Sequence, residues 1–172
     1  MTKQTQRQPD MLITLSAAEV FERYADMVYR LAFSRTKNRS DADDLLQEVF
    51  LRYIKSGAEF SEEEHRKAWL IRVTLNCSIS FMSSAWMRRT VPLSNQHKQV
   101  TSNRTSGSSD ILEAVMQLPA KYRTAIHLFY YEGYSITEIA QLCEIPEATV
   151  KTHLHRAREK LKKKLKGENE DE

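Results

Sequence analysis

The sequence is poor in the residues that build tight turns, with only four Gly and four Pro among 172 residues. A β-sandwich or β-barrel needs a turn roughly every ten residues, and Gly and Pro dominate such turns. Their scarcity therefore argues against an all-β fold and predicts an all-α protein.

Cysteine is scarce as well, since the chain has only Cys77 and Cys143. The two lie far apart, each inside an apolar helical pattern, and they form neither a CxxC pair nor a metal-ligand spacing. We expect both to be small core residues in a reducing compartment. The sequence predicts no metal site and no cofactor.

Long apolar segments are also missing. The N-terminus has no apolar stretch of the signal-peptide type, and no run approaches the ~18 apolar residues that cross a bilayer. Hydrophobic residues make up 41% and charged residues 28%, which suits a protein with a core and a polar surface. We therefore expect a cytoplasmic protein.

What the sequence does contain is a series of helix starts. Ser precedes Glu by three residues before three apolar segments, at Ser16–Glu19, Ser61–Glu64 and Ser135–Glu138, which is the pattern of a capping box. A fourth start is predicted at Ser40, and a fifth at Asp110. Behind the first four, apolar residues recur at helical spacing, for example Val20, Tyr24, Met27, Val28 and Leu31, or Leu46, Val49, Phe50, Tyr53 and Ile54. The segments that begin near Ser16, Ser40 and Ser61 predict one helical bundle. Trp69 lies on the apolar stripe with Val73 and is expected in its core rather than as a platform on which a base stacks.

The helical pattern disappears between two blocks of sequence. Residues 90–109 are rich in Ser, Thr, Asn and Gln, which cannot bury enough apolar surface to form a core, so they predict a flexible linker. Two small helical domains are thus expected, at residues 16–89 and 110–166. Residues 1–15 are expected to be flexible, and residues 167–172 to form an acidic tail.

The second block ends in a short helix, a turn and a long helix. Residues 135–141 predict the short helix and residues 142–145 the turn, with Pro146 at the first position of the next helix. The long helix has an apolar stripe and carries eight Lys or Arg between residues 151 and 166, against the single acid Glu159. This pattern is typical of a helix-turn-helix, although helical hairpins without any DNA partner share it. Arg156 suits a guanine edge, and Lys151 and Thr152 suit bases or phosphates.

These residues resemble a known family. The runs LPAKYRTAIHLFYYEGYS (118–135), EIA (138–140) and TVKTHLHRAR (149–158) look like region 4 of sigma-70-type initiation factors. DADDLLQEVFL (41–51) resembles region 2.2 and WLIRVTLN (69–76) resembles region 2.3. With a short linker in place of other regions, the chain is similar to the extracytoplasmic-function group, and the resemblance covers about 18–88 and 110–165.

The resemblance implies a non-catalytic sigma factor, which binds core RNA polymerase and selects promoters. It assigns contact with the β′ clamp helices to Asp44, Gln47, Glu48 and Phe50, and contact with the minus-10 element to Asn76, Ser80, Arg88 and Arg89. The loop from Ser56 to Glu64 is expected to form part of a pocket for a flipped base. Recognition of the minus-35 duplex falls to Thr149, Lys151, Thr152, His155, Arg156 and Arg158.

The resemblance also implies further partners and marks some departures. The second domain is expected to contact the β flap, and an anti-sigma factor, often membrane-anchored, to hold the protein inactive. Ser80 stands where the family often has Asp, and the basic run after it is thin, with Trp86 as a substitute contact. Glu144 occupies a turn position usually taken by Gly, where a positive φ costs a side-chain-bearing residue about 1 kcal/mol.

Two other classes of protein compete with this interpretation. An ordinary DNA-binding regulator explains residues 135–165 equally well, but it leaves residues 41–51 and 69–76 without a role. An enzyme is suggested only by His65 beside three Glu, with no second ligand and no Gly-rich phosphate loop. A pull-down with core polymerase separates the sigma factor from the regulator.

Overall fold

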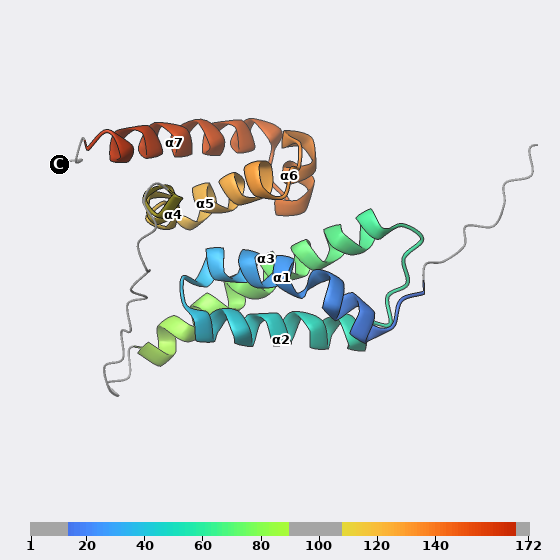
Figure 1. Cartoon of the computed structure of the whole chain (residues 1–172). Coiled ribbons are helices and arrows are strands. Elements are labelled where there is room, and N and C mark those ends of the chain that lie inside the picture. Colours follow the sequence, from blue (N-terminus) through green and yellow to red (C-terminus); the bar gives the residue numbers. More distant parts are fainter. Residues whose placement is uncertain (1–13, 90–107, 168–172) are drawn as a thin grey trace, which may run out of the picture.

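The computed structural model of the chain describes the backbone of residues 14–89 and 108–167 and the side chains of residues 14–84 and 110–167. Every regular element in these residues is a helix, as predicted (Figure 1). The elements are α1 (Ala17–Thr36), α2 (Arg39–Ser56), α3 (Glu63–Arg89), α4 (Ser108–Met116), α5 (Ala120–Ile126), the π-helix η1 (His127–Tyr131), α6 (Ile136–Cys143) and α7 (Glu147–Leu165). The predicted linker lies outside the described residues, apart from its last two positions, which begin α4. Most of the predicted flexible N-terminus and acidic tail also lies outside them.

The first three helices form one bundle, in which α1 packs against both α2 and α3. The predicted capping box starts α1: Glu19 N–H donates to Ser16 Oγ at 3.3 Å, and Ser16 N–H donates to the Glu19 carboxylate at 2.7 Å. The predicted cap of α2 was wrong, because Asn38 and not Ser40 accepts the Asp41 N–H, at 3.1 Å. Asn38 lies one residue before the first helical position, where a side-chain oxygen reaches a free N–H group.

The core of this bundle largely follows the predicted stripes. Val20, Val28, Val49 and Leu70 are fully buried, and Cys77 lies among them as predicted. Leu45, which was not predicted, is fully buried, and the predicted Leu46 is half-buried. Trp69 is half-buried and packs edge-on against Tyr53 at 5.7 Å between ring centroids. Ile54 was wrongly assigned to the core, since it is 59% exposed.

The other elements form the second domain, in which α5 and α6 both pack against α7. The capping box at Ser135 is confirmed, with the Glu138 N–H donating to Ser135 Oγ at 3.2 Å. Three boundaries differ from prediction: α4 begins before Asp110, α6 continues to Cys143, and Pro146 is the N-cap of α7 rather than its first helical residue. The π-helical turn at residues 127–131 was not predicted, because its sequence is compatible with an ordinary helix.

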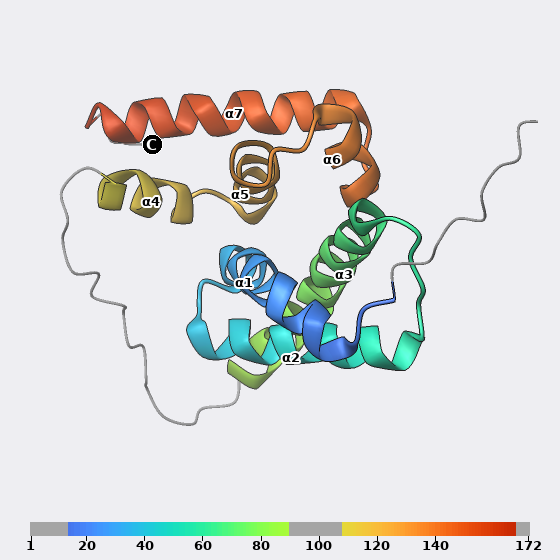
Figure 2. The same cartoon turned by 45° about the vertical axis from the view of Figure 1, so that its right-hand side comes forward.

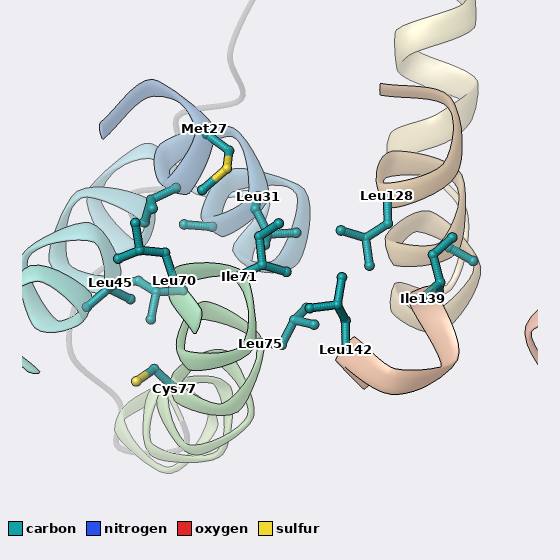
Figure 3. Packing of buried hydrophobic residues seen from close by; sticks show 14 of the residues in the cluster. Met27, Leu31, Leu45, Leu70, Ile71, Leu75, Cys77, Leu128, Ile139 and Leu142 are labelled. Carbon is teal, nitrogen blue, oxygen red and sulfur yellow. The ribbon is translucent and has the colours of Figure 1, made fainter. Parts of the chain in front are cut away.

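The two domains pack against each other through α1 with α5 and α3 with α6 (Figure 2). Apolar side chains continue across this boundary: Leu75 of α3 and Leu142 of α6 point toward one another between the two cores (Figure 3). No helix in the described part of the chain is both long and apolar enough to cross a membrane.

Candidate nucleic-acid and polymerase interface

The buried residues of α7 determine which of its side chains face outward. Val150, Leu154 and Ala157 are at most 1% exposed and pack onto the second domain. Successive residues of an α-helix are about 100° apart around the axis. The rest of the helix surface therefore carries polar groups, and the predicted minus-35 residues Lys151, Thr152, His155, Arg156 and Arg158 are all exposed there. Thr149 is half-buried, and the Thr152 hydroxyl donates to the Ala148 carbonyl at 2.9 Å.

A tight turn joins α6 to α7. Glu144 ends α6 with φ of 56°, and its N–H donates to the carbonyl of Ala140. The predicted positive φ at this position is confirmed. Because the turn is short, α6 lies across the start of α7 and leaves the outer face of α7 open to a ligand.

Two arginines of α7 are held by tyrosines of the preceding elements. Arg156 hydrogen-bonds with the hydroxyl of Tyr122 in α5, and this bond lowers the pKa of Tyr122. Arg158 Nε donates to the hydroxyl of Tyr130 in η1 at 2.7 Å. The sequence alone did not point to either tyrosine, because both lie tens of residues before their arginine partners along the chain.

The exposed face of α2 carries most of the predicted polymerase-binding residues. Asp44 and Gln47 are exposed, and Glu48 is half-buried and accepts from Arg52 Nε at 2.6 Å. Phe50 lies elsewhere: it is only 6% exposed and packs edge-on beneath Phe21 at 4.8 Å. The exposed apolar residues beside this face are Phe21, Leu51 and Ile54, which sequence reasoning did not single out as site residues.

The predicted minus-10 residues lie on α3. Asn76 and Ser80 are exposed one helical turn apart, and the Ser80 carbonyl accepts from the Ser84 hydroxyl at 3.0 Å. Arg88 and Arg89 belong to the last turn of α3, but their side chains and that of Trp86 lie outside the described ones.

Asn76 also lines a pocket of about 200 Å³ between the two domains. Its lining combines Asn76 and Ile79 of α3 with Lys121 of α5, Cys143 of α6 and His153 of α7. Burial lowers the pKa of His153, and the cations Lys121 and Arg156 lower it further. In this arrangement a predicted minus-10 residue and the helix-turn-helix share one cavity.

Two arginines connect the domains beside this pocket. Arg123 of α5 is 2% exposed and donates to the carbonyls of Ser34 and Arg35 at the end of α1, as well as to Leu118 of its own domain. Arg35 in turn donates to the Thr124 hydroxyl at 2.9 Å and to the Ser78 hydroxyl at 3.0 Å. Burial lowers the pKa of Arg123 to about 10, and the neighbouring Arg35 cation contributes.

A second group of polar contacts lies at the other end of the boundary. Lys67 Nζ is 3.6 Å from the Glu132 carboxylate and 5.1 Å from the centre of the Tyr134 ring. Burial alone would raise the pKa of Glu132, but His127, Lys67 and Arg30 outweigh it and hold that pKa below the ordinary value. We refer to the contacts of Arg35, Arg123, Lys67 and Glu132 as the domain seam.

A capped short helix, a tight turn and an outward-facing basic helix define the second domain as a helix-turn-helix of the DNA-binding kind. Comparison with known proteins identifies the family. Models of "Sigma-70 region 2" and "Sigma-70, region 4" match residues 20–88 and 108–161. SigW, an ECF RNA polymerase sigma factor of Bacillus subtilis, is 30% identical over 166 residues, which cover 87% of this chain and 88% of SigW. SigM of Mycobacterium tuberculosis is 29% identical over 150 residues, covering 86% of this chain and 76% of SigM.

The chain therefore belongs to the extracytoplasmic-function group of the sigma-70 family. It is a non-catalytic subunit that directs RNA polymerase to promoters. This result excludes the enzyme, and the match over region 2 excludes the simple regulator.

Solved structures agree with the fold. The sigma factor RpoE of Bartonella quintana, crystallised with the anti-sigma factor NepR, has a TM-score of 0.65 at 22% identity, over 88% of this chain and 98% of that one. CnrH, solved with the cytosolic domain of CnrY, has a TM-score of 0.59 at 19% identity, over 89% of each chain.

Proposed function

We propose that the first domain binds the β′ clamp helices through the exposed face of α2. The support is the chemistry of that face, where the carboxylates of Asp44 and Glu48 stand beside the exposed Leu51 and Ile54. Charged and apolar groups on one helix face suit a protein partner better than solvent alone. Phe50 supports this face from beneath by packing against Phe21, rather than touching polymerase itself.

The rest of the proposal concerns DNA. α7 enters the major groove of the minus-35 duplex, and α3 captures the opened minus-10 strand through Asn76, Ser80, Arg88 and Arg89. The observation that carries this assignment is the orientation of α7 about its own axis, which buries its apolar stripe and exposes five of the six predicted minus-35 residues. The second domain also contacts the β flap, for which the exposed Ile111 and Leu112 of α4 are available.

The packed arrangement of the domains cannot hold both promoter elements. The minus-10 and minus-35 elements are numbered by their distance from the transcription start, so they are about 25 base pairs apart, which is about 85 Å of B-form duplex. Asn76, from the proposed minus-10 face, and His153 of α7 line one pocket of about 200 Å³. The domains therefore separate at the seam when the protein acts on a promoter, and the described structure is the closed form.

Regulation follows from the same geometry. An anti-sigma factor, often membrane-anchored in this family, would keep the protein inactive by covering these faces in the closed form. Two of the similar structures are complexes with such partners, NepR and the cytosolic domain of CnrY. The protein itself would act in the cytoplasm, where core polymerase and the chromosome are.

Transcription in vitro tests this function. Core polymerase with the protein should initiate at discrete promoters of the host genome, and core enzyme alone should not. Asp44→Lys should abolish core binding in a pull-down, because it reverses a charge in the proposed contact. Asp26→Lys makes the same change at an exposed position of α1 and should bind as wild type does. Loss of binding in both variants, or in neither, would refute the assignment to α2.

A further inference from the structure

Arg158 does not extend freely into solvent, because aromatic side chains of η1 support it. Its Nε donates to the Tyr130 hydroxyl at 2.7 Å, and its guanidinium carbon lies 5.6 Å from the centre of the Tyr130 ring and 5.8 Å from that of Phe129. The two rings meet edge-on at 4.9 Å. Tyr130 is nevertheless 59% exposed, so both members of the pair remain accessible from outside.

The hydrogen bond between the two residues leaves only donors facing outward. The Tyr130 oxygen accepts from Nε, so its own O–H is available to donate. The Arg158 guanidinium has four more N–H groups, and it has no acceptor. The major-groove edge of guanine also presents acceptors alone, so the donors by themselves do not choose between a base and a phosphate, but only the phosphate carries the charge opposite to that of the guanidinium. The pair matches a phosphate.

The place of Arg158 on α7 indicates which part of the DNA it meets. The buried direction of α7 is set by Val150, Leu154 and Ala157 together. At about 100° per residue, Arg158 leaves the helix about 75° from that direction and stands on the flank, whereas Arg156 leaves it about 125° away, nearer the outer face where Thr152 lies. A helix about 10–12 Å across fills the major groove, about 12 Å wide, so a side chain that leaves its flank meets the groove wall of phosphates.

We propose that Tyr130 and Arg158 together form a phosphate clamp at one wall of the minus-35 major groove. Tyr130 is a positioning residue for Arg158 and also donates its own hydroxyl to the same phosphate. The exposed tyrosine of the π-helical turn thereby acquires a role in promoter binding, and Arg158 anchors α7 without reading a base. This inference rests on the proposed entry of α7 into the minus-35 duplex.

Holoenzyme binding to labelled promoter DNA tests the clamp, with the native minus-35 sequence and with a scrambled one, over a series of KCl concentrations. Arg158→Ala should weaken binding about tenfold on both DNAs. It should also make the slope of log K against log salt less negative by about 0.9, because one phosphate contact is lost. Tyr130→Phe, which keeps the ring, should weaken binding about fivefold on both DNAs. In the Arg158→Ala background it should add less than about twofold, since the two residues act on one phosphate.

Tyr131→Phe is the matched control, because it removes the same hydroxyl from the next residue, which stacks on His127 instead. It should bind as wild type does, and all variants should keep the melting temperature of wild type. The clamp is refuted if Tyr130→Phe binds within twofold of wild type. It is also refuted if Arg158→Ala loses affinity only on the native sequence, or if the two losses add. If wild-type holoenzyme itself fails to prefer the native minus-35 sequence, the proposed function falls, and the clamp with it.

Discussion

The closed form depends on hydrogen bonds that can be removed one at a time. Arg35 donates to two buried hydroxyls, that of Thr124 across the seam and that of Ser78 within its own domain. Thr124→Val deletes the bond from Arg35 across the seam, together with the bond from the Thr124 hydroxyl to the Ala120 carbonyl within α5, and keeps the shape of the side chain. Ser78→Ala deletes the bond within the first domain. Each variant therefore removes one of the two hydroxyl acceptors of Arg35.

The size of the effect follows from the charge on the donor. A hydrogen bond from a charged group contributes about 1.5–3 kcal/mol when its partner is buried. Taking about 1.5 kcal/mol, Thr124→Val should raise the ratio of open to closed molecules about tenfold. Ser78→Ala should leave that ratio unchanged, because the Ser78 bond is present in both forms, and it should instead lower the free energy of unfolding of the first domain.

Energy transfer between dyes at the exposed positions 55 and 162, attached through non-natural residues in α2 and α7, reports this ratio. If the open form is the one that binds the minus-10 strand, its apparent affinity should rise with the open fraction, up to about tenfold for Thr124→Val. The reasoning is refuted if both variants shift the transfer equally, or if Thr124→Val opens the domains and leaves strand affinity unchanged.

Three further predictions follow from single residues. Arg156→Ala should cost roughly 1–3 kcal/mol of holoenzyme binding with the native base at one minus-35 position and little with other bases there; an equal loss on every sequence would point to a phosphate contact instead. Glu144→Gly should raise the free energy of unfolding, measured by urea denaturation, by about 1 kcal/mol, because residue 144 has φ of 56°. An unchanged or lower free energy of unfolding would mean that the Glu144 side chain makes a compensating contact. The folded-state pKa of Glu132 is depressed, so its charge stabilises the fold above the ordinary pKa of 4.5, and that stability is lost as pH falls through the folded pKa. At pH 7, Glu132→Gln should therefore unfold at a lower urea concentration than wild type, and well below pH 4.5 the two should unfold at the same urea concentration. A difference that persists in acid would exclude the charge of Glu132, and with it the ion pair with Lys67, as the cause.

In the proposed closed form, the walls of the pocket restrict the access of promoter DNA to Asn76. Asn76 faces a cavity whose walls belong partly to the second domain, and Arg123 is bound to α1 carbonyls directly beside it. Separation of the domains would open the side of Asn76 that lines the pocket and free Arg123 from the α1 carbonyls, while Arg35 would keep its bond to Ser78. Under the proposed function, a partner that holds the domains together and promoter DNA would shift the equilibrium between closed and open forms in opposite directions.

Features that depend on neighbours in the chain could be predicted from the sequence. The capping boxes at Ser16 and Ser135 form because Ser and Glu three residues apart meet at any helix start. The apolar stripe of α7 determines which residues it exposes, so the exposure of five of the six minus-35 candidates followed from the sequence, whereas Thr149 is half-buried. The positive φ of Glu144 was expected from its position in the turn and is confirmed.

Other features were decided by tertiary structure. Asn38 rather than Ser40 caps α2, and Ile54 is exposed rather than buried, because packing against α1 and α3 sets where α2 begins and how it is rotated. Arg123 and Arg35 donate to groups 88 or 89 residues away along the chain, and no local pattern encodes such a pairing. The same holds for Arg158 and Tyr130, which are 28 residues apart. Sequence periodicity determines which face of a helix is polar, but only the packing of the helices decides which partner each polar group meets.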